Sequence, residues 1–304
     1  MAIQVTEVSE HDYAALIRPA HVYNSTDFTH LNAAKVSSIF FLLFGDTRLR
    51  AGITLGERAD GSLVSGFSSP FGGFDTTREQ EPRKMVEICE VLTRWANGRR
   101  LEIVMPPEIY FASQNAKTRY ALSAVGFRDE RIFNHHIDMT RTPTTLRESL
   151  DSKARNKLRM AERAQFSFSP CGADEAYEII AANRAMRGYP LAMSLNDVKS
   201  TSRIVKSEFF ILRKGETGVA AAMLNSVTPD IKQLVYWGDN GLEAESHPMN
   251  MLAYELAGHY FCSGCKTRLI DLGPSGSYET LNNGLMAFKE SVGGEASLKH
   301  RFLL

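Results

Sequence analysis

The chain has 304 residues, enough for two medium-sized domains or one large domain with a hydrophobic core. Apolar residues make up 43% and charged residues 23%, which is typical of a folded globular protein and excludes a disordered one. The 35 basic residues balance the 35 acidic residues, so no overall positive field would attract nucleic acid. Four cysteines in this length argue against a disulfide scaffold and favour a cytoplasmic location.

The sequence shows neither a membrane span nor a secretion signal. The longest purely apolar run, Ile39 to Phe44, is far too short to cross a bilayer. The first residues, MAIQVTEVSEHDY, have neither a basic start nor an apolar stretch, so we expect no signal peptide.

Strand and helix patterns alternate through the first half of the chain. In chain order we expect a strand at 2–8, helices at 12–17 and 27–35, strands at 36–44, 48–55 and 62–66, a helix at 77–98, a strand at 101–104, a helix at 109–125 and a strand at 130–139. Thr77 is expected to cap the long helix at its start, and Gly98 to end it.

The second half repeats this order. We expect a strand at 166–169, helices at 174–187 and 194–206, strands at 208–213, 218–227 and 231–238, a helix at 248–262, a strand at 268–272, a helix at 278–289 and a strand at 297–302. Two halves with the same order of elements predict a duplicated α/β domain, with a first domain at 1–142 and a second at 143–304.

This order, with a mixed sheet whose central strands splay apart, resembles the GNAT acyltransferase fold used twice. Residues 269–294 read LIDLGPSGSYETLNNGLMAFKESVGG. They resemble a block of the Fem family of aminoacyltransferases, in which a strand ends in an Asp-Leu-Gly turn and a helix bears Phe-Lys before Gly-Gly. The strings SPFGGF, PPEIY, NRAMRGYPLAMS and YWGD resemble uncharacterised GNAT-like proteins of gut bacteria. The resemblance implies an α/β (α+β) chain of two tandem GNAT-like domains, each a mixed, mostly antiparallel sheet flanked by helices.

The resemblance also implies an activity. The chain would transfer an acyl or aminoacyl group to an amine of a phosphorylated or nucleotide-linked metabolite, such as a sugar or peptide precursor. The donor would be acyl-CoA or aminoacyl-tRNA, with the active cleft in the second domain and the first domain shaping the acceptor site. In one respect the sequence departs from CoA-dependent GNAT enzymes, which bind the donor's pyrophosphate at a glycine-rich loop. The matching stretch, Asp239 to Asn250, lacks these glycines and contains two glutamates. Fem proteins also lack the loop.

Acyl transfer to an amine needs proton removal from the ammonium, donors for the developing oxyanion and charge relief for the leaving group. Asp271, Tyr278 and Lys289 are the catalytic candidates, with Asp271 at the carboxyl end of a buried strand, where open α/β sheets bind ligands. By resemblance to the Fem family, Lys289 would help to bind the acceptor and stabilise charge on the acyl group. The alternative is that Asp271 only caps a turn and Lys289 lies along the surface.

Further residues are candidates for substrate binding. Ser275 and Asn282 lie in the loop after Asp271, and Arg187 with Tyr189 could hold an anionic group or simply end a helix. Tyr236 and Asp239 end the strand that would line the cleft. Because side chains alternate along a strand, only one of Tyr236 and Trp237 can face that cleft.

Basic residues suggest phosphate contacts. The stretch 153–163, KARNKLRMAER, resembles a basic helix of Fem-like proteins that contributes to binding a phosphorylated acceptor or tRNA, with Arg155 and Arg159 as the candidates. The alternative is a solvated helix face. Lys35 resembles a lysine that contacts the acceptor's diphosphate in Fem-type enzymes.

No metal site is predicted. Cys262 and Cys265 form a CxxC at a helix end, where the helix dipole opposes thiolate formation, so a structural role is favoured over a zinc or redox site. His135 and His136 are adjacent on a strand, point to opposite faces and cannot chelate one ion together.

Two other functions stay open. A GNAT-derived module that has lost catalysis and only binds a ligand would explain the missing pyrophosphate loop. An RNA-interacting protein that uses the helix at 153–163 is disfavoured by the zero net charge.

Overall fold

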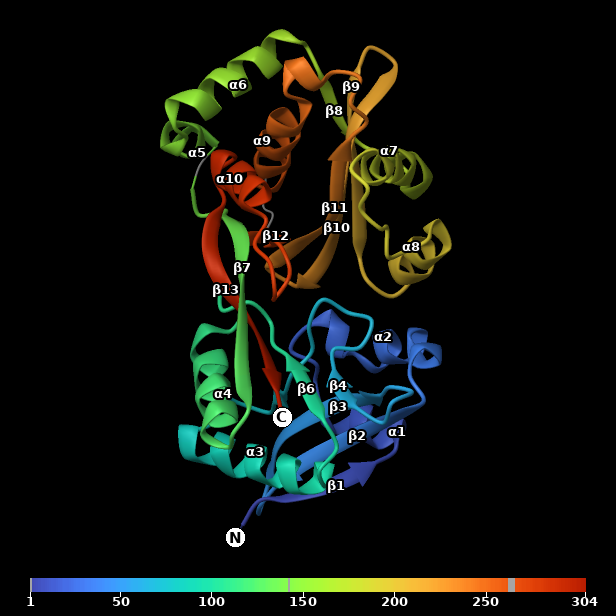
Figure 1. Ribbon diagram of the computed structural model, residues 1–304, viewed down its shortest axis with the longest axis vertical. Helices are drawn as coiled ribbons and strands as arrows, with labels where there is room; N and C mark the ends of the chain where they lie inside the picture. Colours follow the sequence, from blue (N-terminus) through green and yellow to red (C-terminus); the bar gives the residue numbers. More distant parts are fainter. Residues whose placement is uncertain (1, 142, 262–265) are drawn as a thin grey trace. The chain divides into compact units, whose positions relative to one another are not determined.

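The computed structural model describes residues 2–141, 143–261 and 266–304, which form two compact units (Figure 1). Unit 1 comprises Met1–Phe133 with Ser297–Leu304, and unit 2 comprises Asn134–Ala296. The boundary expected after residue 142 falls inside unit 2, and the chain returns to unit 1 for its last eight residues.

Unit 1 alternates strands and helices. Its elements are β1 (Gln4–Val8), α1 (Glu10–Leu16), η1 (Val22–Asn24), α2 (Thr26–Leu31), η2 (Ala33–Lys35), β2 (Ser38–Gly45), β3 (Leu49–Glu57), β4 (Leu63–Ser65), β5 (Asp75–Thr76), α3 (Pro82–Ala96), β6 (Leu101–Val104), α4 (Ala112–Ala124), the first half of β7 (Arg128–Asp138) and most of β13 (Glu295–Leu303).

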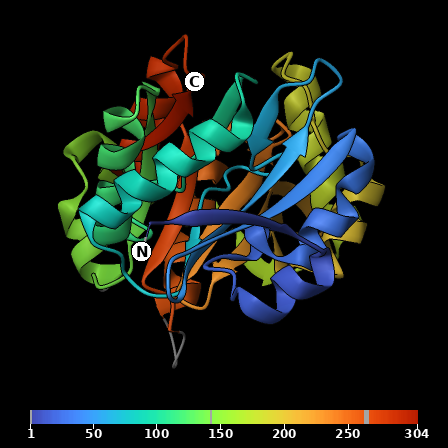
Figure 2. The same ribbon diagram turned by 90° about the horizontal axis from the view of Figure 1, so that it is seen from below.

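The sheet of unit 1 has the order β1-β2-β3-β4-β6-β13, in which only β4 and β6 pair in parallel. Alternation along β2 sends Leu42 and Phe44 into a core with α3 and α4, and Phe41 and Leu43 toward α1 on the opposite face. Figure 2 shows α3 crossing the sheet on the face opposite α1.

Unit 2 begins within β7. Its further elements are α5 (Pro143–Ser149), α6 (Ser152–Arg163), β8 (Ser167–Pro170), α7 (Ala173–Met186), α8 (Leu195–Ser202), β9 (Ser207–Lys214), β10 (Thr217–Thr228), β11 (Ile231–Asp239), η3 (Ala244–Ser246), α9 (Pro248–Phe261), β12 (Leu269–Pro274) and α10 (Asn283–Ser291).

The sheet of unit 2 has the order β7-β12-β11-β10-β9-β8. Along β9, Phe210 and Leu212 pack with α9, whereas Ile211 packs with α7 and α8 on the other face. Both faces are therefore covered by helices, which explains why β9 and β10 are so apolar.

The two central strands of unit 2 separate. β11 and β12 pair in parallel at three positions only, from Ile231 with Leu269 to Gln233 with Asp271. β11 then continues to Asp239, and within the described residues none of these later positions pairs with β12. A register shift between Met223 and Leu224 of β10 falls opposite the point of separation.

Both units are thus mixed, mostly antiparallel sheets flanked by helices, and the predicted fold class is confirmed. Two local expectations were wrong, and one short helix was missed. Helix α3 starts at Pro82, because the Thr77 hydroxyl donates to the backbone of β3 instead of capping a helix. Helix α10 starts at Asn283, after a polar turn, and the short helix α5 was not predicted. In the part of the chain described here, no helix is both long and apolar enough to span a bilayer.

Candidate active site

Lys289 is a buried cation at the end of helix α10. The helix is capped by the Asn282 side chain, which accepts from the Leu285 amide at 2.9 Å. It ends in a Schellman turn, with the Gly293 amide bonded to the Glu290 carbonyl and the Gly294 amide bonded to that of Lys289. These hydrogen bonds fix the last turn of α10. The glycine pair that follows Phe288 and Lys289 therefore helps to orient the Lys289 side chain.

Lys289 is 2% exposed, and its ammonium donates to the backbone carbonyls of Gly273 and Pro274, each at 2.8 Å. An ammonium has three donors. The third N–H has no hydrogen-bond partner among the residues that the structure describes. Lys289 is therefore no surface lysine, and one donor remains for a ligand oxygen.

Burial lowers the pKa of Lys289 to about 7, and the nearby charge of Asp271 opposes this shift. The two protonation states of the amine are thus close in free energy near neutral pH. Groups with such perturbed pKa values concentrate at functional sites.

Asp271 is fully buried on β12, and the described contacts of its carboxylate include three donors. These are Asn134 Nδ2 at 2.7 Å, Gln233 Nε2 at 3.1 Å and the amide of Gly273 at 2.9 Å. The last bond lies within β12, at the register shift between Asp271 and Gly273, so Asp271 holds the backbone near the end of this strand. By fixing Gly273, it also fixes one of the carbonyls that bind Lys289.

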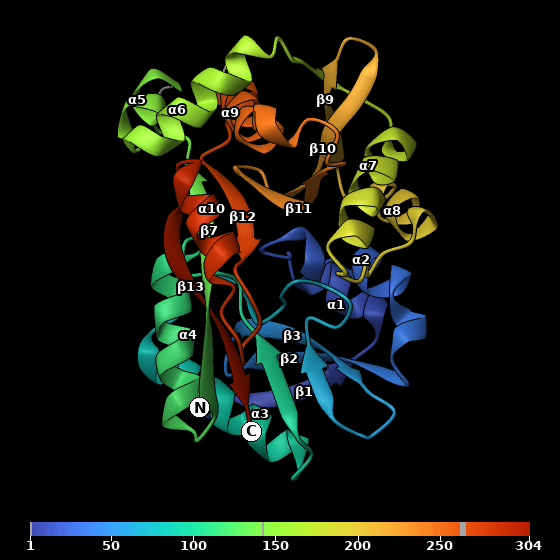
Figure 3. The same ribbon diagram turned by 45° about the horizontal axis from the view of Figure 1, so that its top comes forward.

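Ser275 directly follows β12 and is fully buried. Its hydroxyl lies 2.9 Å from Nδ1 of His135 on β7, and Nε2 of His135 lies 3.6 Å from a carboxylate oxygen of Glu290 on α10. In Figures 1 and 3, β7, β12 and α10 lie side by side. Sequence reasoning did not select His135 or Glu290 for the site. The available signal was strand alternation, which sends the two adjacent histidines to opposite faces of the sheet.

The loop between β12 and α10 carries the other candidates. Tyr278 is half-buried in a turn in which the Ser277 hydroxyl accepts from the amides of Glu279 and Thr280. It therefore lies before the helix and not on it. Asn282 Nδ2 lies 3.5 Å from the hydroxyl of Tyr189, which links this loop to the end of α7.

Tyr236 and Trp237, near the end of β11, point to opposite faces of the sheet. Trp237 contacts Phe288 of α10 with ring centroids 5.4 Å apart, whereas the Arg184 guanidinium lies 5.4 Å from the ring centre of Tyr236 on the α7 side. Trp237, and not Tyr236, therefore shares a side with α10. Asp239 turns back on itself, since its carboxylate accepts from the Gly241 amide at 3.0 Å.

The segment between β11 and α9 lacks the glycine-rich loop, and two amides at the start of α9 are already bonded. The amides of Asn250 and Met251 both point to the His247 carbonyl, at 3.1 and 3.4 Å, and Pro248 has no amide hydrogen. Glu243 and Glu245 add negative charge there. This start of α9 offers little to a pyrophosphate.

Four basic candidates lie on other elements. Lys35 is exposed in unit 1, and Arg187 is exposed at the end of α7. On α6, Ala154, Leu158 and Ala161 are buried as the apolar stripe predicted, Arg159 is exposed, and Arg155 donates to the Glu148 carbonyl at 3.2 Å.

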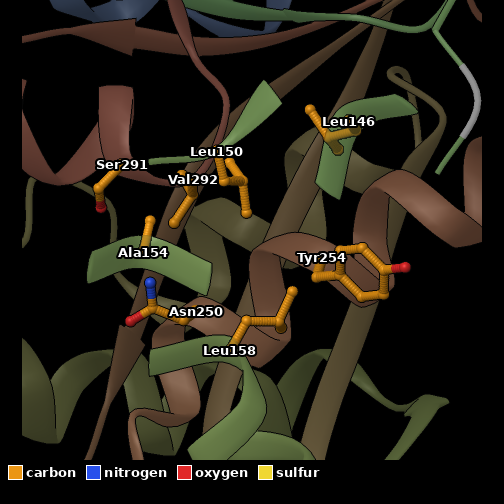
Figure 4. Close-up of a pocket in the computed structure, with 8 residues that line it drawn as sticks. All are labelled: Leu146, Leu150, Ala154, Leu158, Asn250, Tyr254, Ser291 and Val292. Carbon is orange, nitrogen blue, oxygen red and sulfur yellow. The ribbon is translucent and has the colours of Figure 1, made fainter. Parts of the chain in front are cut away.

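A small pocket lies under α6 (Figure 4). It is lined by Leu146, Leu150, Ala154, Leu158, Asn250, Tyr254, Ser291 and Val292. These residues come from α5, α6, α9 and the end of α10, so the pocket adjoins the helix that bears Lys289 and is mostly apolar.

Within the described residues, no group of three or more His, Cys, Asp or Glu side chains could hold a metal ion. The CxxC at Cys262 and Cys265 lies outside the described residues.

The sequence matches no model of a known protein family and no curated protein. Solved structures do match. FemX aligns with a TM-score of 0.68 at 10% identity, covering 98% of this chain and 96% of that one. A conserved protein of unknown function from Bacteroides thetaiotaomicron aligns at 0.58 and 11% identity, covering 99% of both chains. A tandem GNAT protein from the clavulanic acid biosynthesis pathway aligns at 0.52 and 10% identity, covering 99% of this chain and 98% of that one.

The fold is tandem GNAT-like and Fem-like. The three-position pairing of β11 with β12 is then the expected splay of such a sheet, and the Lys289 cluster lies on the strand and helix that follow it.

Proposed function

We propose that the protein transfers an acyl or aminoacyl group to an amine, with the chemistry in unit 2. The observation that carries this proposal is the buried Lys289 ammonium, held by two backbone carbonyls at the end of β12 with one donor unused. The similarity to FemX and to a tandem GNAT protein supports the same reaction class.

In this proposal Lys289 donates its third N–H to the carbonyl oxygen of the acyl group. Negative charge develops on that oxygen when the amine attacks, and a preorganised cation stabilises the transition state more than the ground state. Asp271 holds the Gly273 carbonyl and, through it, the direction of the Lys289 amine.

The residues before α9 bear on the identity of the acyl donor. The occupied amides and the glutamates before α9 disfavour CoA bound in the usual GNAT manner, which supports an aminoacyl-tRNA donor or an acyl-CoA bound in another way. The proposed acceptor is a phosphorylated or nucleotide-linked amine, with Arg187, Tyr189 and the basic face of α6 as its contacts. A cytoplasmic location stays a prediction.

The lack of a glycine-rich pyrophosphate loop before α9 also favours a second candidate function, a ligand-binding module without catalysis. Both functions predict a ligand, and only the first predicts a product. One experiment therefore separates them.

The test is a thermal-shift screen against acetyl-CoA, longer acyl-CoAs, aminoacyl-tRNA and UDP-linked sugar and peptide precursors, followed by mass spectrometry of any product. A ligand at 100 times its Kd adds about 2.7 kcal/mol to the free energy of unfolding. Lys289→Met should reduce turnover at least 100-fold, about the effect of losing one oxyanion donor. Lys199→Met, at an exposed lysine paired with Asp174 in the same unit, is the control and should keep full turnover.

A ligand without product would select the binding module. Turnover by Lys289→Met at the wild-type rate would exclude Lys289 from the chemistry.

A further inference from the structure

His135, Ser275 and Glu290 form a connected row that the role of Lys289 leaves unexplained. His135 and Ser275 are both fully buried, and the Glu290 side chain is 48% exposed. The row therefore starts at the turn that holds Lys289 and ends in solvent. Ser275 comes directly after the two residues whose carbonyls bind the Lys289 ammonium.

We propose that Ser275, His135 and Glu290 are a proton relay between the end of β12, where the Lys289 ammonium is bound, and solvent. Its use in catalysis rests on the proposed acyl transfer. His135 is in this scheme a positioning and proton-carrying residue that acts through Ser275.

The surroundings of His135 favour this role. The titratable groups that influence its charge are Lys289 and Glu290 on α10 and the adjacent His136, which points to the opposite face of β7, while Asp271 on β12 is engaged by Asn134 and Gln233. Burial lowers the pKa of His135, the charge of Lys289 lowers it further and Glu290 opposes both. The ring is thus neutral at neutral pH. The carboxylate beside Nε2 favours the tautomer with its proton there, which leaves Nδ1 to accept from the Ser275 hydroxyl.

The outer link is the longer one. At 3.6 Å, Nε2 and the Glu290 oxygen are too far apart for a direct hydrogen bond. Glu290 is half-exposed, so a small rotation of its side chain or one bridging water closes this gap.

The relay gains and loses equal numbers of protons in one turnover. When the acceptor nitrogen loses a proton to Ser275 Oγ, the serine proton passes to Nδ1 and the Nε2 proton passes to Glu290 and water. The new C–N bond forms and the bond from the acyl carbon to the donor's sulfur or ribose oxygen breaks. Ser275 then gives its proton to that leaving atom, takes one from Nδ1, and Nε2 is reprotonated from Glu290. The relay ends in its starting tautomer, and no electron transfer is involved.

The first test needs no substrate. In protein labelled with ¹⁵N-lysine, the Lys289 ammonium signal is identified by its loss in Lys289→Met, and its proton exchange with water is measured at pH 6. His135→Asn keeps a polar group near the Nδ1 position but cannot carry a proton, and it should slow this exchange at least tenfold. Glu290→Gln, a conservative change at a half-exposed position, should also slow it.

The matched control is His136→Asn, the same substitution one residue further on the opposite face of β7. It should exchange at the wild-type rate, and the thermal unfolding of every variant is measured to confirm folding. Exchange in His135→Asn or in folded Glu290→Gln that is as fast as in the wild type, or faster, would overturn the relay.

The second test uses whichever donor and acceptor the screen above identifies. His135→Asn should lower kcat at least tenfold, leave the KM of the donor unchanged and flatten the acid limb of the pH profile. Slowed exchange with no transfer from any donor would leave the relay standing and remove the proposed function. Transfer by His135→Asn with the wild-type kcat and pH profile would overturn the catalytic use of the relay.

Discussion

At the scale of single residues, the site depends on a charged group placed where water is excluded. Removing an ammonium from water costs several kcal/mol unless polar partners replace the solvent. Two carbonyls of one turn replace part of that solvent around Lys289, and Asp271 adds an opposite charge. The remaining cost appears as the lowered pKa.

This burial makes stability depend on pH in a defined direction. The pKa of Lys289 is about 7 in the folded chain and takes its ordinary value of 10.5 when unfolded. Between these pH values the unfolded chain binds more protons, so folding becomes more stable as the pH rises, by at most about 1.4 kcal/mol per pH unit. Lys289→Met lacks this contribution. The stability advantage of the wild type over Lys289→Met should therefore grow between pH 7 and 9.5 and stay constant between pH 5 and 6.5.

Urea unfolding at four pH values measures this difference, and the exposed Lys199→Met variant should run parallel to the wild type throughout. If the free energy of unfolding of Lys289→Met ran parallel to that of the wild type at all pH values, the Lys289 amine of the wild type would have the same pKa in the folded and unfolded chains.

At the scale of elements, the glycine pair after α10 determines where the helix ends. Gly293 has φ of +90°, and a Cβ added there would overlap Leu146 Cδ1 of α5. Gly293→Ala should lower the free energy of unfolding by about 1–3 kcal/mol, because the left-handed backbone is strained with a side chain and α5 must shift.

Gly284→Ala, in the first turn of the same helix, is the matched comparison. Gly284 has an ordinary helical backbone and only a normal contact to Asn282, so this change should be neutral or stabilise by up to about 1 kcal/mol. Thermal unfolding of both variants checks the contrast. Equal effects at the two positions would contradict the role of the Gly293 turn.

The elements themselves could largely be predicted from the sequence, because each half alternates apolar strands with amphipathic helices. Helix α5 was not predicted because it is short and Leu146 is its one buried residue, so it shows no apolar periodicity. The Lys289 block could be recognised by its Fem-like spacing, but its burial could not. His135 and Ser275 are 140 residues apart in sequence, so only the pairing of β7 with β12 brings their strands together.

At the scale of the whole molecule, the last strand, β13, belongs mostly to unit 1, although the rest of unit 1 ends at Phe133. Arg301, Phe302 and Leu303 of β13 pair with β6, and Phe302 is fully buried in the core of unit 1. Phe302→Ala should destabilise unit 1 by about 3–5 kcal/mol, the usual cost of emptying a buried aromatic site.

Hydrogen exchange resolved by peptide measures where the loss falls. Phe302→Ala should speed exchange in β2 and β3, and the control Leu212→Ala, at a fully buried position of β9, should speed exchange in β9 and β10. An effect of Phe302→Ala confined to unit 2 would contradict the assignment of the last strand to unit 1.

The return of the chain to unit 1 also sets the order of events on the ribosome. Unit 2 is one continuous stretch, residues 134–296, whereas unit 1 must wait for residues 297–304, which are translated after all of unit 2. The half that is translated first is thus completed last. Until then β6 has no β13 beside it, and an unpaired strand edge invites association with other chains. Synthesis of β13, and not of residues 1–133, is therefore the step at which this edge of β6 is covered.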